Sequence, residues 1–195
     1  TFQGKTVLIT GAGGGIGRAL AKEFALRRAN LALHSLPAET GPLREFALEL
    51  EETYGIRTWI FPIDLLDENG PETLYTEVTT SAGDIYALVN NAGSVVYGRF
   101  WEESWESQSD MFRLNLYVPM RLMHLFLPDM IRQGKGAVFN TSSVSALQPT
   151  PFQSVYGATK AGLLSLSRGL RAELKKTGVT VCTLNPPYVD TDLLK

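Results

Sequence analysis

Tyr156 and Lys160 lie four residues apart in a segment with helical periodicity, so their side chains share one helix face. A tyrosine normally titrates near pH ~10 and is a poor base at neutral pH. A nearby ammonium group stabilises the phenolate and lowers the tyrosine pKa. The pair could therefore transfer a proton beside a redox cofactor. The same spacing is also common in exposed helix pairs that do no chemistry.

A glycine-rich turn follows the first apolar segment of the chain. Residues 7–9 are typical of a buried strand, and TGAGGGIG occupies residues 10–17. Glycines allow a tight turn whose backbone N–H groups approach a pyrophosphate, and the next helix points its positive end there. Gly11, Gly15 and Gly17 match the three structural roles of the glycines in a dinucleotide-binding turn. A flexible surface turn is the alternative. A Walker loop is excluded because no Lys-Ser/Thr pair follows the glycines.

The elements that must position these residues alternate along the chain. Apolar segments predict strands at 7–9, 31–33, 59–63, 86–89, 137–140 and 179–184. Amphipathic segments predict helices at 17–28, 43–54, 71–82, 106–133 and 155–176. This alternation predicts an α/β fold, namely a doubly wound parallel sheet (Rossmann fold) in a three-layer α/β/α arrangement. No boundary for a second domain is visible, so residues 1–195 are predicted to form a single domain.

Composition excludes several other classes of protein. The chain has 195 residues, 44% of them hydrophobic and 19% charged, which is typical of a globular domain rather than a disordered segment. Its net charge of −2 gives no electrostatic support for a nucleic-acid or membrane partner. Cys182 is the single cysteine, and His34 and His124 lack metal-ligand spacing, so we expect no disulfide and no metal. No membrane span or signal peptide is visible, and we expect a cytoplasmic location.

Taken in order, the motifs resemble those of the short-chain dehydrogenase/reductase superfamily over nearly the whole chain. Besides the glycine turn, they are Asp64-Leu65, Asn90-Asn91-Ala92-Gly93, Asn115, Ser143 in a Thr-Ser-Ser run, and YGATK at residues 156–160. Ser143 precedes Tyr156 by 13 positions, which is the family spacing.

The resemblance implies an NAD(P)-dependent oxidoreductase that acts on a small carbonyl compound or secondary alcohol. Tyr156 would exchange the proton at the substrate oxygen, and Ser143 would hydrogen-bond that oxygen. Lys160 would lower the tyrosine pKa and hold the nicotinamide ribose. Asn115 would mark a break in its helix and anchor a water in the proton relay. Without the resemblance, Ser143 could equally cap a loop, and Asn115 could be a buried polar group.

The resemblance also implies which residues contact the cofactor. They are Gly11, Gly13, Gly14, Gly15, Ile16, Gly17, His34, Ser35, Asp64, Leu65, Asn91, Ala92, Gly93, Tyr156, Lys160, Pro186, Val189 and Thr191. Asn90 is expected to bond nearby backbone and shape the cleft. Asp64 is expected near the adenine, although it could also be the N-cap of the following helix.

The end of the second predicted strand bears on the choice between NAD and NADP. An acidic residue there would bond the ribose 2′-hydroxyl and repel a 2′-phosphate. The chain has His34-Ser35-Leu36 instead, without that acid and without the arginine common in NADP-dependent relatives. His34 with Ser35 could bond a 2′-phosphate. The sequence therefore favours NADP slightly over NAD.

Two features leave a second function open. Pro187 stands where the family usually has glycine, and the chain ends at Lys195, before the usual seventh strand and substrate lid. Both would suit a non-catalytic nucleotide-binding regulatory or scaffold protein. The complete Asn–Ser–Tyr–Lys set favours the enzyme. We expect residues 1–195 to be the ordered part of a longer chain, and the family implies a homodimer or homotetramer formed through the long helices.

Overall fold

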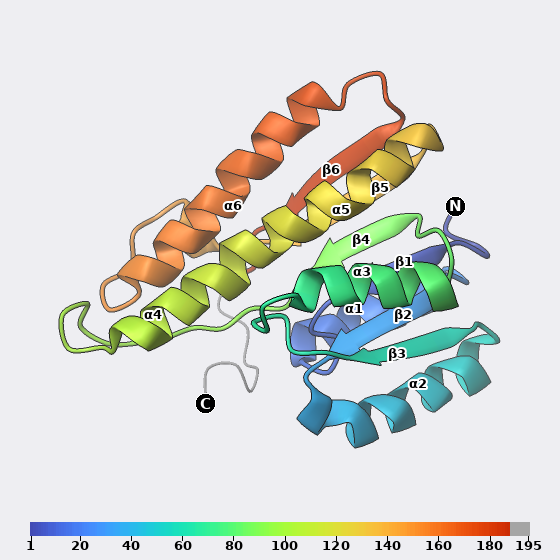
Figure 1. The fold of residues 1–195 in the computed structure, drawn as a ribbon, viewed down its shortest axis with the longest axis horizontal. Helices are drawn as coiled ribbons and strands as arrows, with labels where there is room; N and C mark the ends of the chain where they lie inside the picture. The colour runs from blue at the N-terminus through green and yellow to red at the C-terminus, as the bar shows by residue number, and fades with distance from the viewer. Residues whose placement is uncertain (188–195) are drawn as a thin grey trace.

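A computed structural model of the chain describes residues 1–187. Six strands form one parallel sheet in the order β3-β2-β1-β4-β5-β6 (Figure 1). The strands are β1 (Thr6–Ile9), β2 (Asn30–Ser35), β3 (Thr58–Pro62), β4 (Ala87–Asn90), β5 (Gly136–Thr141) and β6 (Val179–Leu184). The order reverses between β1 and β4, which in such sheets opens a ligand-binding crevice at the carboxyl ends of the strands. The predicted doubly wound Rossmann fold is confirmed.

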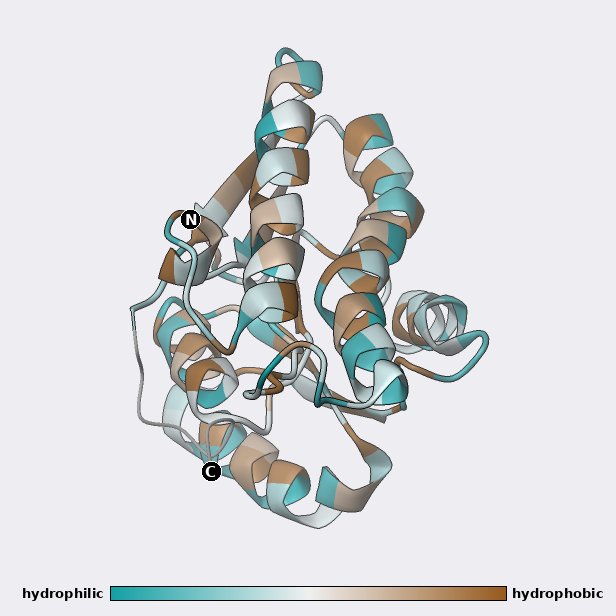
Figure 2. Ribbon diagram, turned by 90° about the vertical axis from the view of Figure 1, so that its left-hand side faces the viewer, coloured by the Kyte–Doolittle hydropathy of each residue, from teal (hydrophilic) through white to brown (hydrophobic). Residues whose placement is uncertain are grey.

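Helices cover both faces of the sheet. They are α1 (Gly15–Leu26), α2 (Thr40–Tyr54), α3 (Gly70–Ser81), α4 (Trp105–Phe112), α5 (Val118–Arg132) and α6 (Ser154–Glu173), with short 3₁₀ turns η1 (Pro37–Glu39) and η3 (Val144–Ala146). Along β1 the side chains alternate between two cores. Val7 and Ile9 pack with α1 and α2, whereas Leu8 packs with α3, α5 and α6. The helices in Figure 2 carry both apolar and polar residues, as expected when one side of each is buried.

The stretch predicted over residues 106–133 is not one continuous helix, and it is interrupted at Asn115, where the resemblance implied a break. A π-helical turn, η2 (Arg113–Tyr117), separates α4 from α5. The physical reason is Pro119, whose ring nitrogen cannot donate to the carbonyl of Asn115 four residues earlier. The neighbouring Val118 N–H instead reaches back five residues to the Arg113 carbonyl. Asn115 lies within this π-helical turn, outside the regular hydrogen-bond pattern of an α-helix.

The loops that follow β1, β4 and β5 meet at the carboxyl edge of the sheet. They carry the glycine turn, the Asn91-Ala92-Gly93 segment and Ser143, and α6 brings Tyr156 and Lys160 to the same edge. Within residues 1–187, no helix is long and apolar enough to cross a membrane. The described residues also contain no cluster of three or more His, Cys, Asp or Glu side chains that could hold a metal ion.

Candidate active site

The glycine turn is compact because two of its glycines admit no side chain. Gly11 has a φ of +64°, and a Cβ there would lie 2.9 Å from the Cα of Ala92. A Cβ on Gly17 would overlap the Gly11 carbonyl oxygen. A Cβ on Gly14 would make only an ordinary contact, at 3.8 Å from the Gly11 carbonyl oxygen. Gly14 precedes the first residue of α1, whose N-terminal N–H groups have no side-chain cap. These free N–H groups and the helix dipole suit an anion such as a pyrophosphate.

Asn91 ties the ends of three strands together beneath the turn. Its Nδ2 donates to the carbonyls of Thr10 (3.2 Å) and Gly11 (3.1 Å), and its Oδ1 accepts from the Thr141 hydroxyl (3.3 Å). The Thr10 hydroxyl accepts from the N–H groups of Asn91 and Ala92, both at 3.0 Å. This polar network fixes the spacing of β1, β4 and β5 at the crevice.

Asn90 has a different place from the one expected. The side chain is buried on the other side of β4 and donates through Nδ2 to Asn140 Oδ1 at 2.8 Å. Asn140 in turn donates to the Ser167 hydroxyl at 2.8 Å. The backbone bonds assigned to Asn90 are made by Asn91, because adjacent strand residues point to opposite faces.

The structure contradicts the expectation that His34 bonds a 2′-phosphate. His34 is buried, and its Nδ1 accepts from the Gly11 N–H at 3.2 Å while its Nε2 donates to the Ile63 carbonyl at 2.9 Å. Burial lowers its pKa to about 4, although the bond to Ile63 and the nearby Asp64 carboxylate act in the opposite direction. A neutral imidazole with both nitrogens in use has no group left for a phosphate. Ser35 is also buried, and its hydroxyl donates to the Leu36 carbonyl.

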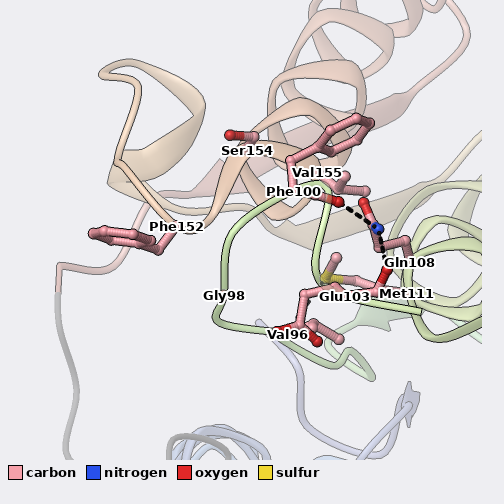
Figure 3. Close-up of a pocket in the computed structure, with 9 residues that line it drawn as sticks. All are labelled: Val96, Gly98, Phe100, Glu103, Gln108, Met111, Phe152, Ser154 and Val155. Atoms are coloured by element: carbon pink, nitrogen blue, oxygen red, sulfur yellow. Dashed lines mark hydrogen bonds between the residues drawn. The ribbon is translucent and has the colours of Figure 1, made fainter. Parts of the chain in front are cut away.

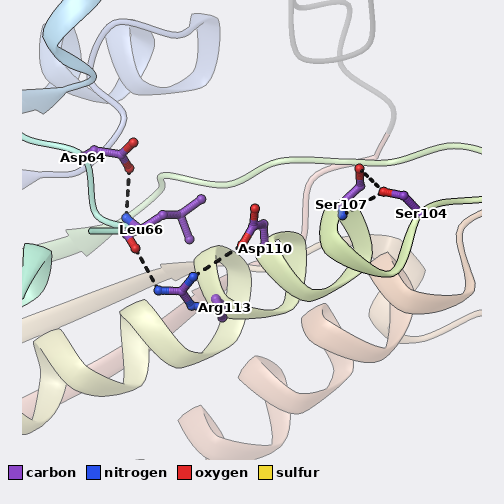
Figure 4. A network of polar contacts seen from close by, with 6 residues as sticks. All are labelled: Asp64, Leu66, Ser104, Ser107, Asp110 and Arg113. Atoms are coloured by element: carbon purple, nitrogen blue, oxygen red, sulfur yellow. Dashed lines mark hydrogen bonds and ion pairs between the residues drawn. The ribbon is translucent and has the colours of Figure 1, made fainter. Parts of the chain in front are cut away.

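Asp64 organises the loop after β3. Its Oδ1 accepts from the Leu66 N–H at 2.9 Å, which closes a local turn, and α3 begins only at Gly70, so Asp64 is not the helix N-cap. Leu65 is buried in the core, so only its backbone can face a ligand. Figure 4 shows the loop joined to the π-helical turn, where Arg113 donates to the Leu66 carbonyl at 2.7 Å and pairs with Asp110.

Asn115 joins the π-helical turn to the loop after β4. The residue is fully buried, with its Oδ1 accepting from the Ser94 N–H at 2.9 Å and its Nδ2 donating to the Ser94 carbonyl at 2.8 Å. A Cβ on Gly93 would lie 2.9 Å from Asn115 Oδ1 and 3.5 Å from Lys160 Nζ, so this loop passes close to both. The helix break and the buried position agree with the geometry expected of Asn115.

Ser143 and Tyr156 lie next to each other where β5 ends and α6 begins. The Ser143 hydroxyl caps η3 by accepting from the Ser145 N–H at 3.1 Å, so the loop-cap role also holds. Burial raises the pKa of Tyr156, and the adjacent Ser143 hydroxyl acts in the opposite direction. The Lys160 ammonium lies 5.6 Å from the centroid of the tyrosine ring.

Lys160 is held beneath the tyrosine by the end of β5. Its Nζ donates to the Thr141 carbonyl at 2.9 Å, and its own carbonyl accepts from the Ser142 hydroxyl at 2.9 Å. Burial lowers the pKa of Lys160 to about 8. Thr141 thus contacts both Lys160 and Asn91, a role that the sequence did not suggest, although a polar residue at the end of a buried strand was a usable signal.

A cavity of about 260 Å³ lies beside these groups, between α1 and the ends of β5 and β6. Its lining residues are Ile16, Leu20, Thr141, Leu184, Asn185 and Pro186. The buried Oδ1 of Asn185 has no hydrogen-bond partner among the described residues. A nicotinamide dinucleotide fits these features, since it has an anionic centre for the glycine turn, an apolar ring and amide donors. Val189 and Thr191 lie outside the described residues.

A second, much smaller recess lies on the α4 side of the site (Figure 3). Its volume of about 10 Å³ holds at most one water. Gln108 closes it by donating to the carbonyls of Phe100 (3.1 Å) and Glu103 (3.2 Å). The loop after β4 is also bonded to the loop before α6, through the Gly98 N–H and the Phe152 carbonyl at 3.0 Å. These two loops form one wall beside Tyr156.

Comparison with known proteins identifies the class. The family model for short chain dehydrogenases matches residues 5–195, and the chain belongs to this family. A very-long-chain 3-oxoacyl-CoA reductase of Anas platyrhynchos is 34% identical over 198 residues, covering 98% of this chain and 62% of the relative. The chain thus spans less than two thirds of that curated relative's length.

Solved structures of similar sequence share the fold of this chain and are also longer than it. A short-chain dehydrogenase from Sphingobium yanoikuyae in complex with NADPH has a TM-score of 0.91 and 33% identity, covering 97% of this chain and 73% of that one. A short chain dehydrogenase/reductase from Burkholderia phymatum in complex with NAD has a TM-score of 0.91 and 29% identity, covering 98% and 68%. Both dinucleotides therefore occur among structural relatives of this chain.

Proposed function

We propose that the protein is an NAD(P)-dependent oxidoreductase that interconverts a small carbonyl compound and the corresponding alcohol. The observation that carries this proposal is the convergence of Ser143, Tyr156 and Lys160 at the edge of the sheet where the glycine turn lies. A bound nicotinamide would supply or accept the hydride. The family membership and the dinucleotide complexes of its relatives support the same function.

Each polar residue at the proton-transfer end, which we define as Asn115, Ser143, Tyr156 and Lys160, has a distinct part. In the reduction direction, the Tyr156 phenol donates its proton to the substrate oxygen as hydride reaches the carbon. The Ser143 hydroxyl donates a hydrogen bond to that oxygen and stabilises its developing charge. Lys160 binds the nicotinamide ribose and holds a positive charge beneath the phenolate that remains. Asn115 fixes the Ser94 backbone and anchors the relay water.

The cofactor contacts follow the cleft from one end to the other. The glycine turn would bind the pyrophosphate, Asp64 and the Leu65 backbone would contact the adenine, and Asn91-Ala92-Gly93 would line the floor of the cleft. Pro186, Val189 and Thr191 are assigned to the nicotinamide side of the cleft.

The rim of the site favours an apolar substrate. Large apolar side chains are exposed on the loops after β4 and β5: Tyr97, Phe100, Trp101, Leu147 and Phe152. Tyr97 and Phe152 come from different loops and lie with their ring centroids 5.6 Å apart. An alkyl or aryl group next to the reacting carbonyl would be removed from water against this rim.

We also propose a homodimer or homotetramer in the cytoplasm, built from a single domain that belongs to a longer chain. Exposed apolar residues follow the outer side of α4, η2 and α5, namely Phe112, Tyr117 and Met120. A second copy of the chain packed there would bury them.

The test is a hydride-transfer assay with ketones and aldehydes and with NADH or NADPH, following the nicotinamide absorbance. Tyr156→Phe should lower turnover at least about a thousandfold, because it removes the proton donor. Dinucleotide affinity, measured by fluorescence titration, should change less than about twofold. Tyr54→Phe, which removes a hydroxyl at the end of α2, is the matched control and should keep full turnover. Full activity in Tyr156→Phe, or no dinucleotide binding by the wild type, would overturn the proposal.

A further inference from the structure

The end of β2 lacks an acidic residue, but the structure brings one there from the next turn. Glu39 is the last residue of η1, four positions after Ser35. A Cβ built on Gly13 would lie 2.8 Å from Glu39 Oε2 and 3.7 Å from the Ser35 Cβ. The Glu39 carboxylate therefore reaches back over the end of β2 and lies against the glycine turn.

Contacts of β2 fix where this carboxylate lies relative to the cleft. His34 holds the turn from two sides, since its carbonyl accepts from the Ala12 N–H at 2.8 Å and its ring accepts from the Gly11 N–H. The end of β2 and the pyrophosphate-binding turn thus form one rigid unit. In dinucleotide-binding folds, an acid at the end of this strand hydrogen-bonds the adenosine ribose, and the Glu39 carboxylate lies over that strand end.

From this geometry we propose that Glu39 selects the cofactor, by accepting hydrogen bonds from the adenosine 2′-hydroxyl of NAD and by repelling the 2′-phosphate of NADP. The inference rests on the proposed oxidoreductase function. It reverses the preference for NADP that the sequence favoured. The side chain of Ser35 is too short and already bonded to Leu36, so Glu39 supplies the carboxylate that the strand itself lacks.

The cation nearest the turn does not offset this carboxylate. Arg18 donates through Nε to the Gly13 carbonyl at 3.1 Å and through a terminal nitrogen to the Pro42 carbonyl at 3.3 Å, and it stacks on the Phe46 ring. These contacts hold the guanidinium against α2, and two of its N–H donors are already bonded to backbone carbonyls. Glu39 has no ion-pair partner within residues 1–187.

The test compares the binding of NADH and NADPH by fluorescence titration, without any substrate. Wild-type protein should bind NADH more tightly. Glu39→Gln should tighten NADPH binding about tenfold and weaken NADH binding a few-fold, since it removes one charge and keeps the shape. Glu52→Gln, near the far end of α2, removes the same charge and should leave the ratio of the two Kd values unchanged.

Two further measurements locate the effect. Raising the salt concentration should narrow the NADH-to-NADPH difference in the wild type, because an exposed carboxylate is screened, and should have less effect in Glu39→Gln. Adenosine 2′,5′-bisphosphate and adenosine 5′-monophosphate can each be used as a competitor of the bound dinucleotide. The ratio of their Kd values should change between the wild type and Glu39→Gln as the ratio for the whole dinucleotides does.

The outcomes separate this inference from the function on which it rests. If both dinucleotides bind and Glu39→Gln leaves their Kd ratio unchanged, the role of Glu39 is wrong and the proposed function stands. If the wild type prefers NADPH and Arg18→Met removes that preference, Arg18 is the selector instead. If neither dinucleotide binds, both the function and the inference fail.

Discussion

The proton-transfer end of the cleft differs from its adenosine end, which we define as His34, Ser35, Glu39 and Asp64. At the proton-transfer end, three of the four side chains assigned to chemistry are held in the interior, and Tyr156 is half-buried. Asn115 is 0% exposed, Lys160 5% and Ser143 7%, and their bonds join β4, β5, η2 and α6. These bonds leave the side chains little freedom to move independently.

The adenosine end separates support from recognition. His34 and Ser35 are buried and hold the backbone, whereas Glu39, which we assign to the ligand, is an exposed side chain on a short turn. An exposed charge can be replaced without opening the core. The comparison suggests that the reaction is constrained by packing, while the choice between NAD and NADP depends on a position that tolerates substitution.

The largest effect that would sharpen this contrast comes from Lys160→Met. Turnover should fall at least about a hundredfold, because the charge beneath the phenolate is lost. The free energy of unfolding at pH 7 should not fall, since burial opposes the ammonium and methionine fills the same space. Urea unfolding and the hydride-transfer assay measure both quantities on one preparation.

The pH dependence of the unfolding free energy, compared between the wild type and Lys160→Met, tests the direction of the Lys160 pKa shift. The folded state lowers the pKa of Lys160 from 10.5 to about 8, so the unfolded chain binds the proton more tightly between these values. Wild-type stability should therefore rise relative to Lys160→Met from about pH 8 to 10.5, by on the order of 3 kcal/mol. Lys135→Met, at an exposed lysine before β5, is the control. A variant more than about 1 kcal/mol less stable at pH 7 would contradict the account.

The second prediction concerns His34, which supports the adenosine end. Its pKa is 6.5 when unperturbed and about 4 in the fold, so the unfolded chain binds more protons between these values. Stability should fall as the pH drops from about 6.5 to 4, with a contribution from His34 on the order of 3 kcal/mol. His34→Gln should lose that part of the pH dependence.

His124 provides the matched control, because it is the other histidine of the chain and is exposed on α5. His124→Gln should keep the wild-type slope of unfolding free energy against pH, measured in urea at several pH values. Equal slopes for His34→Gln and the wild type would show that the imidazole does not hold the turn as described.

The sequence predicted the buried end better than the exposed one, and the reason is physical. The spacing of Ser143, Tyr156 and Lys160 is fixed by one loop and one helix, so it is readable along the chain. The three side chains do meet, and the fold adds a contact that the spacing could not show, namely the bond from the Lys160 ammonium to the Thr141 carbonyl.

At the adenosine end, the sequence showed which residue types are present but not where their side chains point. His34 was taken as a ligand because a histidine followed a strand, yet strand alternation turns it inward to Gly11 and Ile63. Glu39 went unnoticed because it belongs to the following turn and reaches back over Ser35. The alternation of strands and helices predicted the layers of the sheet, and the resemblance implied a break at Asn115. The π-helical form of that break follows from the backbone donor that Pro119 lacks.

The smallest predicted effect tests whether the two ends act independently. Arg113 is one link between them, since it extends from the π-helical turn to the Leu66 carbonyl beside Asp64 (Figure 4). The contact is exposed and pairs with Asp110 at 3.4 Å, so its net contribution should be below about 1 kcal/mol. Arg113→Met should raise the Kd for NADH by about two- to threefold through the Asp64 loop and change kcat by less. A kcat loss of tenfold or more with unchanged Kd would mean that the π-helical turn couples the two ends, because Asn115 would then have moved with Arg113.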